Sequence, residues 1–324
     1  MQYRILGRTG LKVSVLGFGT GGPRKFGQDS GVPFEQQRAL VQRCFDRGIN
    51  LFDTAQGYGD SELLLARTLE GVPRHQYVLS SKWSHTEWKS PTGSGEEDGP
   101  IWEDPEKVAE GVETSLQRLA TDYLDIFHLH GVLPEHCAVV AERFGPVIER
   151  LKEQGKIRFL SLSERYIIDP KHDGCIAGMK RNPELWDIIM IKYGILNQWA
   201  AREALPLAQR TGAGVMNMAA VRIKLPDPVK LEALIADWKQ RQLIDHDSVP
   251  DKDPLGWLLH DGVTSVTDAA YKFGADHSAV GTLLTGTANI EHLEQNIAAM
   301  QQPQLPEDDK QKLIQLFSHI AEYA

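Results

Sequence analysis

Short apolar runs rich in Val, Ile and Leu alternate along this chain with stretches whose apolar residues recur at helical spacing. This alternation is typical of repeated βα units and predicts a parallel sheet. We expect strands at residues 14–20, 50–55, 77–82, 124–130, 159–163, 188–193, 214–219 and 280–286. The pattern alone allows either a barrel or a doubly wound sheet.

The amphipathic stretches between these strands predict helices, among them 35–47, 105–119, 144–153, 200–210 and 290–300, with a last helix after Pro306. Residues 3–6 and 12–15, separated by a glycine-containing turn, predict a small hairpin that would close a barrel floor. Two segments that follow strands, 86–104 and 225–260, interrupt the rhythm, and we expect them to be loops over the substrate site. The first of them could equally be a solvated surface loop.

Length and composition favour one globular domain over residues 1–324, because the chain is 41% hydrophobic and 24% charged. A formal charge of −9 without a basic stripe argues against nucleic-acid binding. No apolar stretch is long enough to cross a membrane, and residues 1–10 lack the apolar core of a signal peptide. Three scattered cysteines make a disulfide framework improbable. We therefore expect a cytoplasmic protein.

The strongest local signal is the segment 51–62, in which a strand runs into a glycine-rich turn that carries Tyr58 and then into a helix. Asp53 and Tyr58 share the top of this strand. Taken alone, the acid could be a helix cap and the tyrosine a packing residue. Further polar residues at neighbouring strand ends favour a functional site over these structural roles.

Lys82 ends the next predicted strand, and strand alternation places it on one face with Ser80 and Val78. A buried ammonium needs a carboxylate partner, and Asp53 on the adjacent strand is the natural one. A purely structural ion pair would satisfy that need equally well. His130, at the end of the strand that follows, reaches the same rim. We therefore expect Asp53, Tyr58, Lys82 and His130 to converge.

Such a group of residues suits carbonyl reduction, which needs an acid to protonate the oxygen while hydride reaches the carbon. A free tyrosine, with a pKa near ~10, is a slow donor at neutral pH. A nearby ammonium favours the phenolate, and an imidazole can orient the substrate oxygen and relay protons. We expect Tyr58 to be the proton donor of such a site.

These residues resemble the aldo-keto reductase family, whose signature is similar to Asp53, Thr54, Ala55, Tyr58, Gly59, Ser61 and Glu62. The opening 6–20 and the segments 122–130, 155–158 and 291–296 are also similar to family sequences, in the same order and spacing. The resemblance covers nearly the whole chain. It implies a (β/α)₈ TIM barrel with a short N-terminal hairpin and extra loops or helices at its C-terminal face. It also implies hydride transfer between a nicotinamide cofactor and a small carbonyl compound or alcohol, with Asp53, Tyr58, Lys82 and His130 as a catalytic tetrad.

The same resemblance implies a set of cofactor contacts along the barrel mouth. The matching positions are Gly19, Thr20, Asp53, Ser163, Glu164, Met190, Tyr193, Met218, Ala219, Val221, Gly286, Thr287, His292, Gln295 and Asn296. Several depart from the family pattern. Glu164 replaces an asparagine, Met190 a glutamine, Met218 an aromatic residue and Ala219 a serine. We expect Tyr193 to be a substitute ring for the nicotinamide, although an aromatic at a strand end is more often part of the core.

The adenosine end distinguishes NADP(H) from NAD(H), because a 2′-phosphate is held by Lys or Arg. The loop 286–289 contains no basic residue, and His292 stands where the family has an arginine. The predicted helix from residue 290 could offer its N-terminus to an anion. Family resemblance favours NADP(H), and the missing basic residues leave NAD(H) open. For the substrate, Trp83, Trp102 and Trp88 could wall an apolar pocket or pack against helices.

Two other classes of protein remain possible. His128 and His130 have a spacing that puts both imidazoles on one strand face, as in metal-dependent hydrolases, but the sequence shows no further histidine at a suitable strand end. His128 could instead fill a layer inside the barrel. The departures at the cofactor positions also allow a non-catalytic nucleotide sensor or regulatory subunit, like the barrel subunits of potassium channels that resemble the same family. The oligomeric state is not predicted.

Overall fold

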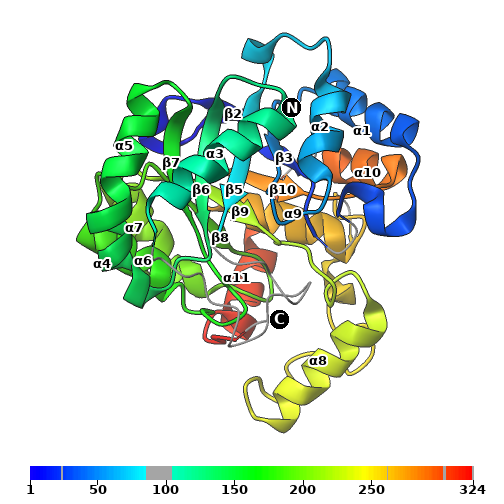
Figure 1. Cartoon of the computed structure of the whole chain (residues 1–324). Helices are drawn as coiled ribbons and strands as arrows, with labels where there is room; N and C mark the ends of the chain where they lie inside the picture. Colours follow the sequence, from blue (N-terminus) through cyan, green and yellow to red (C-terminus); the bar gives the residue numbers. More distant parts are fainter. Residues whose placement is uncertain (23–24, 85–103, 261, 302–303, 323–324) are drawn as a thin grey trace.

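The computed structural model describes residues 1–22, 25–84, 104–260, 262–301 and 304–322. Within this described part, eight parallel strands close into a barrel in the order β10-β3-β4-β5-β6-β7-β8-β9, with β10 paired to β3 (Figure 1). The strands are β3 (Leu16–Gly19), β4 (Leu51–Asp53), β5 (Val78–Trp83), β6 (Leu124–His130), β7 (Ile157–Ser163), β8 (Ile188–Lys192), β9 (Gly214–Met218) and β10 (Val280–Thr285). The predicted strands are confirmed, and closure decides for the (β/α)₈ barrel.

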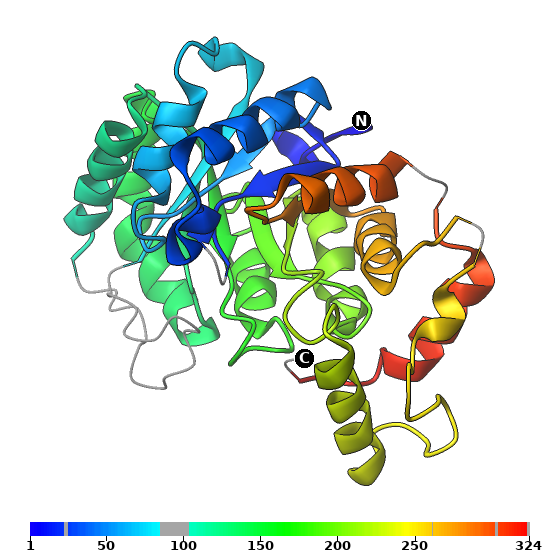
Figure 2. The ribbon, with the colours of Figure 1, turned by 90° about the vertical axis from the view of Figure 1, so that its right-hand side faces the viewer.

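Helices surround the barrel as an outer layer (Figures 1 and 2). They are α1 (Phe34–Asp46), α2 (Ser61–Leu69), α3 (Glu106–Leu119), α4 (Cys137–Val139), α5 (Gly145–Glu153), α6 (Asp173–Arg181), α7 (Ala204–Thr211), α8 (Pro228–Gln240), α9 (Val266–Asp276), α10 (Ile290–Gln301) and α11 (Glu307–Phe317). The amphipathic pattern explains this layer, because a helix in it turns one apolar stripe toward the sheet, whereas α8 projects away from the barrel (Figures 1 and 2). The six helices predicted above are confirmed to within a few residues.

The barrel floor is closed by the predicted hairpin, in which β1 (Tyr3–Ile5) pairs antiparallel with β2 (Lys12–Ser14). Leu6, Leu11 and Val13 pack inside the barrel against Leu51, Val78, Ile126, Ile188, Met190 and Met216. Gly7 in the turn has φ +52°, and a Cβ there would overlap the backbone of Gly214. Only glycine fits this close approach, so the turn can seat directly under β9.

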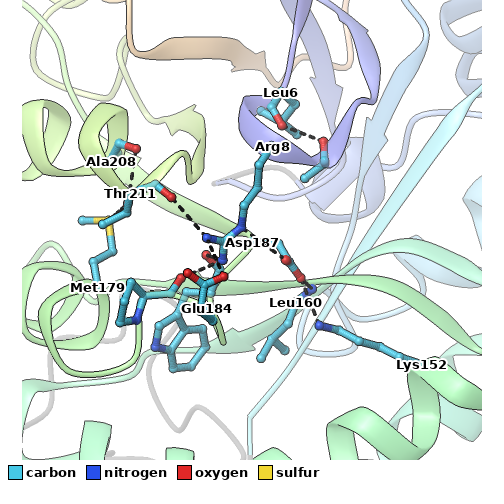
Figure 3. Close-up of polar contacts among 12 residues, drawn as sticks. Leu6, Arg8, Lys152, Leu160, Met179, Glu184, Asp187, Ala208 and Thr211 are labelled. Atoms are coloured by element: carbon cyan, nitrogen blue, oxygen red, sulfur yellow. Dashed lines mark hydrogen bonds and ion pairs between the residues drawn. The ribbon is translucent and has the colours of Figure 1, made fainter.

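Arg8 fixes the same turn to the floor (Figure 3). Its guanidinium donates to the carbonyl oxygens of Pro183 at 2.6 Å, Trp186 at 3.1 Å and Thr211 at 3.1 Å. Nε also lies 3.8 Å from Oδ1 of Asp187. A planar fork of donors is suited to collecting several carbonyl groups from different loops. The floor is therefore sealed by polar contacts outside and apolar packing inside, which leaves the other end of the barrel for a site.

The segment 225–260, expected to be a loop, contains helix α8, which projects away from the barrel (Figures 1 and 2). Asp227 caps it by accepting from the backbone N–H of Lys230, and Pro228 occupies its first turn. Its apolar stripe includes Trp238, which packs on Phe317 of α11. The apolar residues of 231–238 recur at helical spacing and so indicate a helix. The nearby Pro226 and Pro228 made the segment resemble a loop. The other expected loop, 86–104, lies outside the described residues except for Asp104.

Cys44, Cys137 and Cys175 are free, buried thiols. No helix among the described residues has both the length and the apolar character needed to span a bilayer.

Candidate active site

Three of the four predicted site residues stand at the carboxyl ends of neighbouring strands. Asp53 ends β4, Lys82 lies one residue before the end of β5, and His130 ends β6. Tyr58 lies on the turn between β4 and α2, where its backbone N–H donates to the carbonyl oxygen of Ala55 at 3.1 Å. Parallel strands bring their carboxyl ends to one rim, so residues distant in sequence meet at the barrel mouth.

Lys82 and Asp53 form an ion pair between Nζ and Oδ2, with side-chain exposures of 1% and 4%. Nζ also donates to the carbonyl oxygen of Thr54 at 2.9 Å. Burial lowers the pKa of Lys82, but Asp53 and Tyr58 outweigh it through charge and hydrogen bonds and raise the pKa above that of ordinary lysine. The side chain is therefore an ammonium ion at neutral pH, held inside the mouth by its carboxylate.

Tyr58 completes the group. Nζ of Lys82 lies 5.1 Å from the centroid of its ring, and the imidazole of His130 meets the ring edge to face, with centroids 6.3 Å apart and planes at 88°. The backbone of Gly21 lies close to the other side, since a Cβ there would come within 2.6 Å of Cε2 of Tyr58. The phenol, ammonium, carboxylate and imidazole are thus assembled as expected.

The imidazole of His130 is neutral at physiological pH. Burial, followed by the charges of Lys82 and Arg165, lowers the pKa of His130 to about 3. A neutral imidazole can donate one hydrogen bond to a substrate oxygen, but it is a poor source of protons.

One layer below, Ser80 and His128 support the carboxylate. Oγ of Ser80 donates to Oδ1 of Asp53 at 2.8 Å and lies 2.7 Å from Nε2 of His128. His128 is fully buried, and burial lowers its pKa well below the ordinary value. Within the described residues, no cluster of three or more His, Cys, Asp and Glu side chains is arranged to hold a metal ion. The buried imidazole of His128 lies inside the barrel in contact with Ser80.

The predicted cofactor positions follow the rim on either side of the tetrad. Closure of the barrel makes β10 a neighbour of β3, which brings Gly286 close to Gly19, as a Cβ at Gly286 would lie 3.2 Å from the carbonyl oxygen of Gly19. Ser163 pairs in register with His130 and Met190, and its Oγ is buried without a hydrogen-bond partner among the described groups. A buried, unsatisfied hydroxyl beside His130 suits a ligand amide.

On the far side of Ser163, Met190 lies inside the barrel in the apolar cluster that packs on the hairpin, and Met218, Ala219 and Val221 lie at or just after the end of β9. Ala219 has φ +55°, a left-handed conformation that costs a non-glycine residue about 1 kcal/mol. The chain thus turns sharply where β9 ends.

Around the start of α10, where the adenosine end of a cofactor was predicted, polar groups are already engaged with one another. Asn289 caps α10 by accepting from the backbone N–H groups of Glu291 at 2.7 Å and His292 at 3.3 Å. Two backbone N–H groups in the first turn of α10, the turn predicted to be able to bind an anion, are therefore already hydrogen-bonded within the chain. Nδ2 of Asn296 donates to Oγ1 of Thr285 at 2.9 Å, Oγ1 of Thr287 contacts the carbonyl oxygen of Asn289 at 3.3 Å, and His292 and Gln295 are exposed.

Two predicted site residues, Glu164 and Tyr193, have partners among the surrounding helices and loops. The Glu164 carboxylate contacts Nδ1 of His172 at 2.8 Å and accepts from the backbone N–H of Lys192 at 2.7 Å. The Tyr193 ring stacks on Phe273 of α9, with centroids 5.5 Å apart. These side chains alternate with those that enter the barrel, which explains why neither turns toward the tetrad.

Trp83 follows the same alternation. Its indole lies against α3, where a Cβ at Gly111 would overlap the ring. The arrangement supports the packing interpretation of this residue. Trp88 and Trp102, the other tryptophans considered for the substrate pocket, lie outside the described residues.

Sequence reasoning missed the basic and aromatic residues beside the mouth. Arg165 and Tyr166 follow β7, and Lys192 ends β8. Lys192 was foreseeable, because it stands two residues after the inward Met190 and so shares its face.

Comparison with known proteins agrees with this fold. The model of the aldo/keto reductase family matches residues 15–316. L-galactose dehydrogenase from Arabidopsis thaliana is 26% identical over 93% of this chain and 88% of its own. The NADH-specific methylglyoxal reductase of Escherichia coli is 35% identical over 65% of each chain. A solved aldo-keto reductase from Bacillus halodurans, in its holo form, superimposes with a TM-score of 0.69 at 25% identity, covering 100% of this chain and 98% of that one. The chain belongs to the aldo/keto reductase family.

Proposed function

We propose that this protein transfers hydride between a nicotinamide cofactor and an aldehyde, a ketone or the corresponding alcohol, with Tyr58 as the general acid or base. The observation that carries the proposal is the meeting of Tyr58, Lys82, Asp53 and His130 at the barrel mouth. Family membership supports the reaction class.

Each residue has a part that follows from its surroundings. In the reducing direction, Tyr58 donates its hydroxyl proton to the carbonyl oxygen as negative charge develops there. Lys82 stabilises the phenolate that remains, and Asp53 holds the ammonium in place. His130, being neutral, donates a hydrogen bond that orients the carbonyl oxygen. When bound, the reduced nicotinamide supplies the hydride.

The rim fits such a cofactor at the nicotinamide end, where the unsatisfied Oγ of Ser163 would bind the carboxamide. Gly19, Thr20 and Gly286 would provide backbone close to the ribose and phosphates, and Asn296 and Gln295 would flank the adenine. NADP(H) is the favoured cofactor on family resemblance. NAD(H) is the alternative, favoured by the absence of Lys and Arg from residues 286–296 and by the E. coli relative that is named as NADH-specific.

The test combines cofactor binding with turnover. NADPH and NADH are titrated separately by fluorescence, and aldehydes and ketones are then screened with the tighter cofactor. Tyr58→Phe should lose about 10²- to 10⁴-fold in kcat while its Kd for the cofactor stays within about twofold, since the phenol is asked only to move a proton. Tyr3→Phe, at an exposed tyrosine of the hairpin, is the matched control and should keep the parent rate. Equal rates for Tyr58→Phe and the parent would exclude the proposed donor.

A second candidate is a non-catalytic nucleotide sensor or regulatory subunit, favoured by the departures from the family pattern at Glu164, Met190, Met218 and Ala219. It predicts that the parent binds the cofactor but turns over no member of the panel. The tetrad, with its buried ion pair intact, supports the enzyme.

A further inference from the structure

A second set of charged side chains lies beside the tetrad, after β7, β8 and β9. The ring of Tyr166 contacts two cations, with Nζ of Lys192 at 5.3 Å and Cζ of Arg222 at 5.4 Å from its centroid. Nη1 of Arg222 also donates to the Tyr166 hydroxyl. We call Arg165, Tyr166, Lys192 and Arg222 the basic rim. An aromatic face shared by two cations holds both at a defined place, despite their mutual repulsion.

The basic rim adjoins the catalytic group. Lys192 is 3% exposed and stands in register with Met218 at the carboxyl end of β8, on the face of the strand that enters the barrel. Arg165 is 5% exposed, and its charge helps to lower the pKa of His130. A cation that acts on His130 lies within electrostatic range of any carbonyl that His130 would orient.

Lys192 and Arg222 repel one another at this place. Burial, followed by the charges of Arg222 and Lys224, lowers the pKa of Lys192 to about 7, and Glu164 acts in the opposite sense. The Glu164 carboxylate is occupied by His172 and by a backbone N–H. Nε of Arg222 is buried without a hydrogen-bond partner among the described groups. A buried guanidinium N–H without a partner among the described groups favours a bound acceptor, and an anionic acceptor would also offset the repulsion between Arg222 and Lys192.

We propose that the basic rim binds the anionic group of the substrate, so that the protein prefers aldehydes or ketones bearing a phosphate or a carboxylate. Guanidinium and ammonium donors suit both groups, by charge-assisted hydrogen bonds. The proposal rests on the proposed function, since the basic rim would bind another part of the same substrate whose carbonyl group Tyr58 protonates. The cofactor pyrophosphate is another source of the same chemistry, and the experiment separates the two.

The test compares substrates that differ mainly in an anionic group, namely butanal against 4-oxobutanoate and glyceraldehyde against glyceraldehyde 3-phosphate. Lys192→Met removes the charge and keeps the length of the side chain. It should lower the ratio of kcat/KM for the anionic over the neutral member at least tenfold. Lys192→Arg should keep the preference. Lys12→Met, on the floor hairpin, makes the same change in net charge and should leave both rates unchanged.

Cofactor titration is measured alongside. An unchanged Kd for the cofactor in Lys192→Met, with loss of the anionic preference, supports the proposal. An equal loss of kcat/KM for the anionic and the neutral substrate overturns the proposal. If the Kd for the cofactor is also raised, Lys192 binds the cofactor pyrophosphate instead. A ratio that does not change also overturns the proposal.

If the parent turns over none of these substrates, the proposed function fails. A further measurement then still tests whether the basic rim binds an anion. Protein saturated with the tighter-binding nicotinamide cofactor is heated with and without inorganic phosphate. The pyrophosphate then already fills its own site, so a rise in Tm that is present in the parent and lost in Lys192→Met reports a separate anion site. No rise in the parent would overturn the basic rim.

Discussion

Lys82 and Asp53 form an ion pair inside the barrel mouth in which both side chains are almost wholly buried. The carboxylate also accepts from Ser80 at 2.8 Å, and the ammonium also donates to a carbonyl oxygen at 2.9 Å. A buried pair is weak evidence for stability in itself, because desolvation opposes the attraction. Its consequence is positional, since the ammonium is fixed beside Tyr58.

Removing one partner of this pair should be much worse than removing both. Lys82→Met leaves the Asp53 carboxylate buried without its counter-ion, and we expect a loss of about 3–5 kcal/mol in the free energy of unfolding. The double variant Asp53→Asn, Lys82→Met contains neither charge and should recover most of that loss. Both variants should lack activity. Urea unfolding of the parent and the two variants measures the difference, and equal stability of the single and double variants would contradict the ion-pair argument.

The neutral state of His130 predicts how stability depends on acid. Its pKa is about 3 in the folded chain and ~6.5 when unfolded. Between these values the unfolded chain binds a proton that the folded chain does not. The contribution of His130 is therefore complete above pH ~6.5 and is lost as the pH falls toward 3, at no more than ~1.4 kcal/mol per pH unit.

The matched variant is His130→Gln, which cannot titrate. Its free energy of unfolding, measured by urea at a series of pH values, should fall less steeply between pH ~6.5 and ~3 than that of the parent. Other groups contribute to both curves and cancel in the difference. Parallel curves would mean that His130 titrates alike in the two states.

The strands and the tetrad were accessible to sequence reasoning because each depends on local pattern. Strand alternation assigned Lys82 to the inner face, and the shared rim of parallel strands assigned His130 and Asp53 to one place. Closure of the barrel, which makes β10 a neighbour of β3, joins residues far apart in the chain, and the repeat pattern alone did not separate it from an open sheet.

Side-chain direction beyond the strand ends was the harder part. Tyr193 was expected beneath a nicotinamide, yet its ring stacks on Phe273 of a helix that lies some eighty residues later in the sequence. Glu164 is paired with His172, which has a left-handed backbone conformation at the start of α6. Such contacts depend on where a loop returns to the barrel, and periodicity carries no information about that.

Packing between Trp83 and α3 gives a prediction with a clear control. A Cβ at Gly111 would overlap the indole, so Gly111→Ala should lower the free energy of unfolding by about 1–3 kcal/mol, although alanine is the better helix former. Gly145→Ala makes the same change in α5, where the new Cβ would meet only Leu185, at 4.0 Å. That variant should be neutral or stabilised by up to ~1 kcal/mol. Equal effects in urea unfolding would mean that the indole moves aside freely.

The basic rim predicts that the preference for an anionic over a neutral substrate depends on pH. The pKa of Lys192 is about 7, set by burial and by Arg222 and Lys224, with Glu164 opposing them. Its charged form binds the anion, so the ratio of kcat/KM for 4-oxobutanoate over butanal should fall as pH rises from ~6 to ~8. The carboxylate of 4-oxobutanoate is ionised throughout this range, which leaves the protein as the titrating partner. Lys192→Arg, charged at every pH in the range, should give a flat ratio. A parent ratio that does not change with pH would remove Lys192 from substrate recognition.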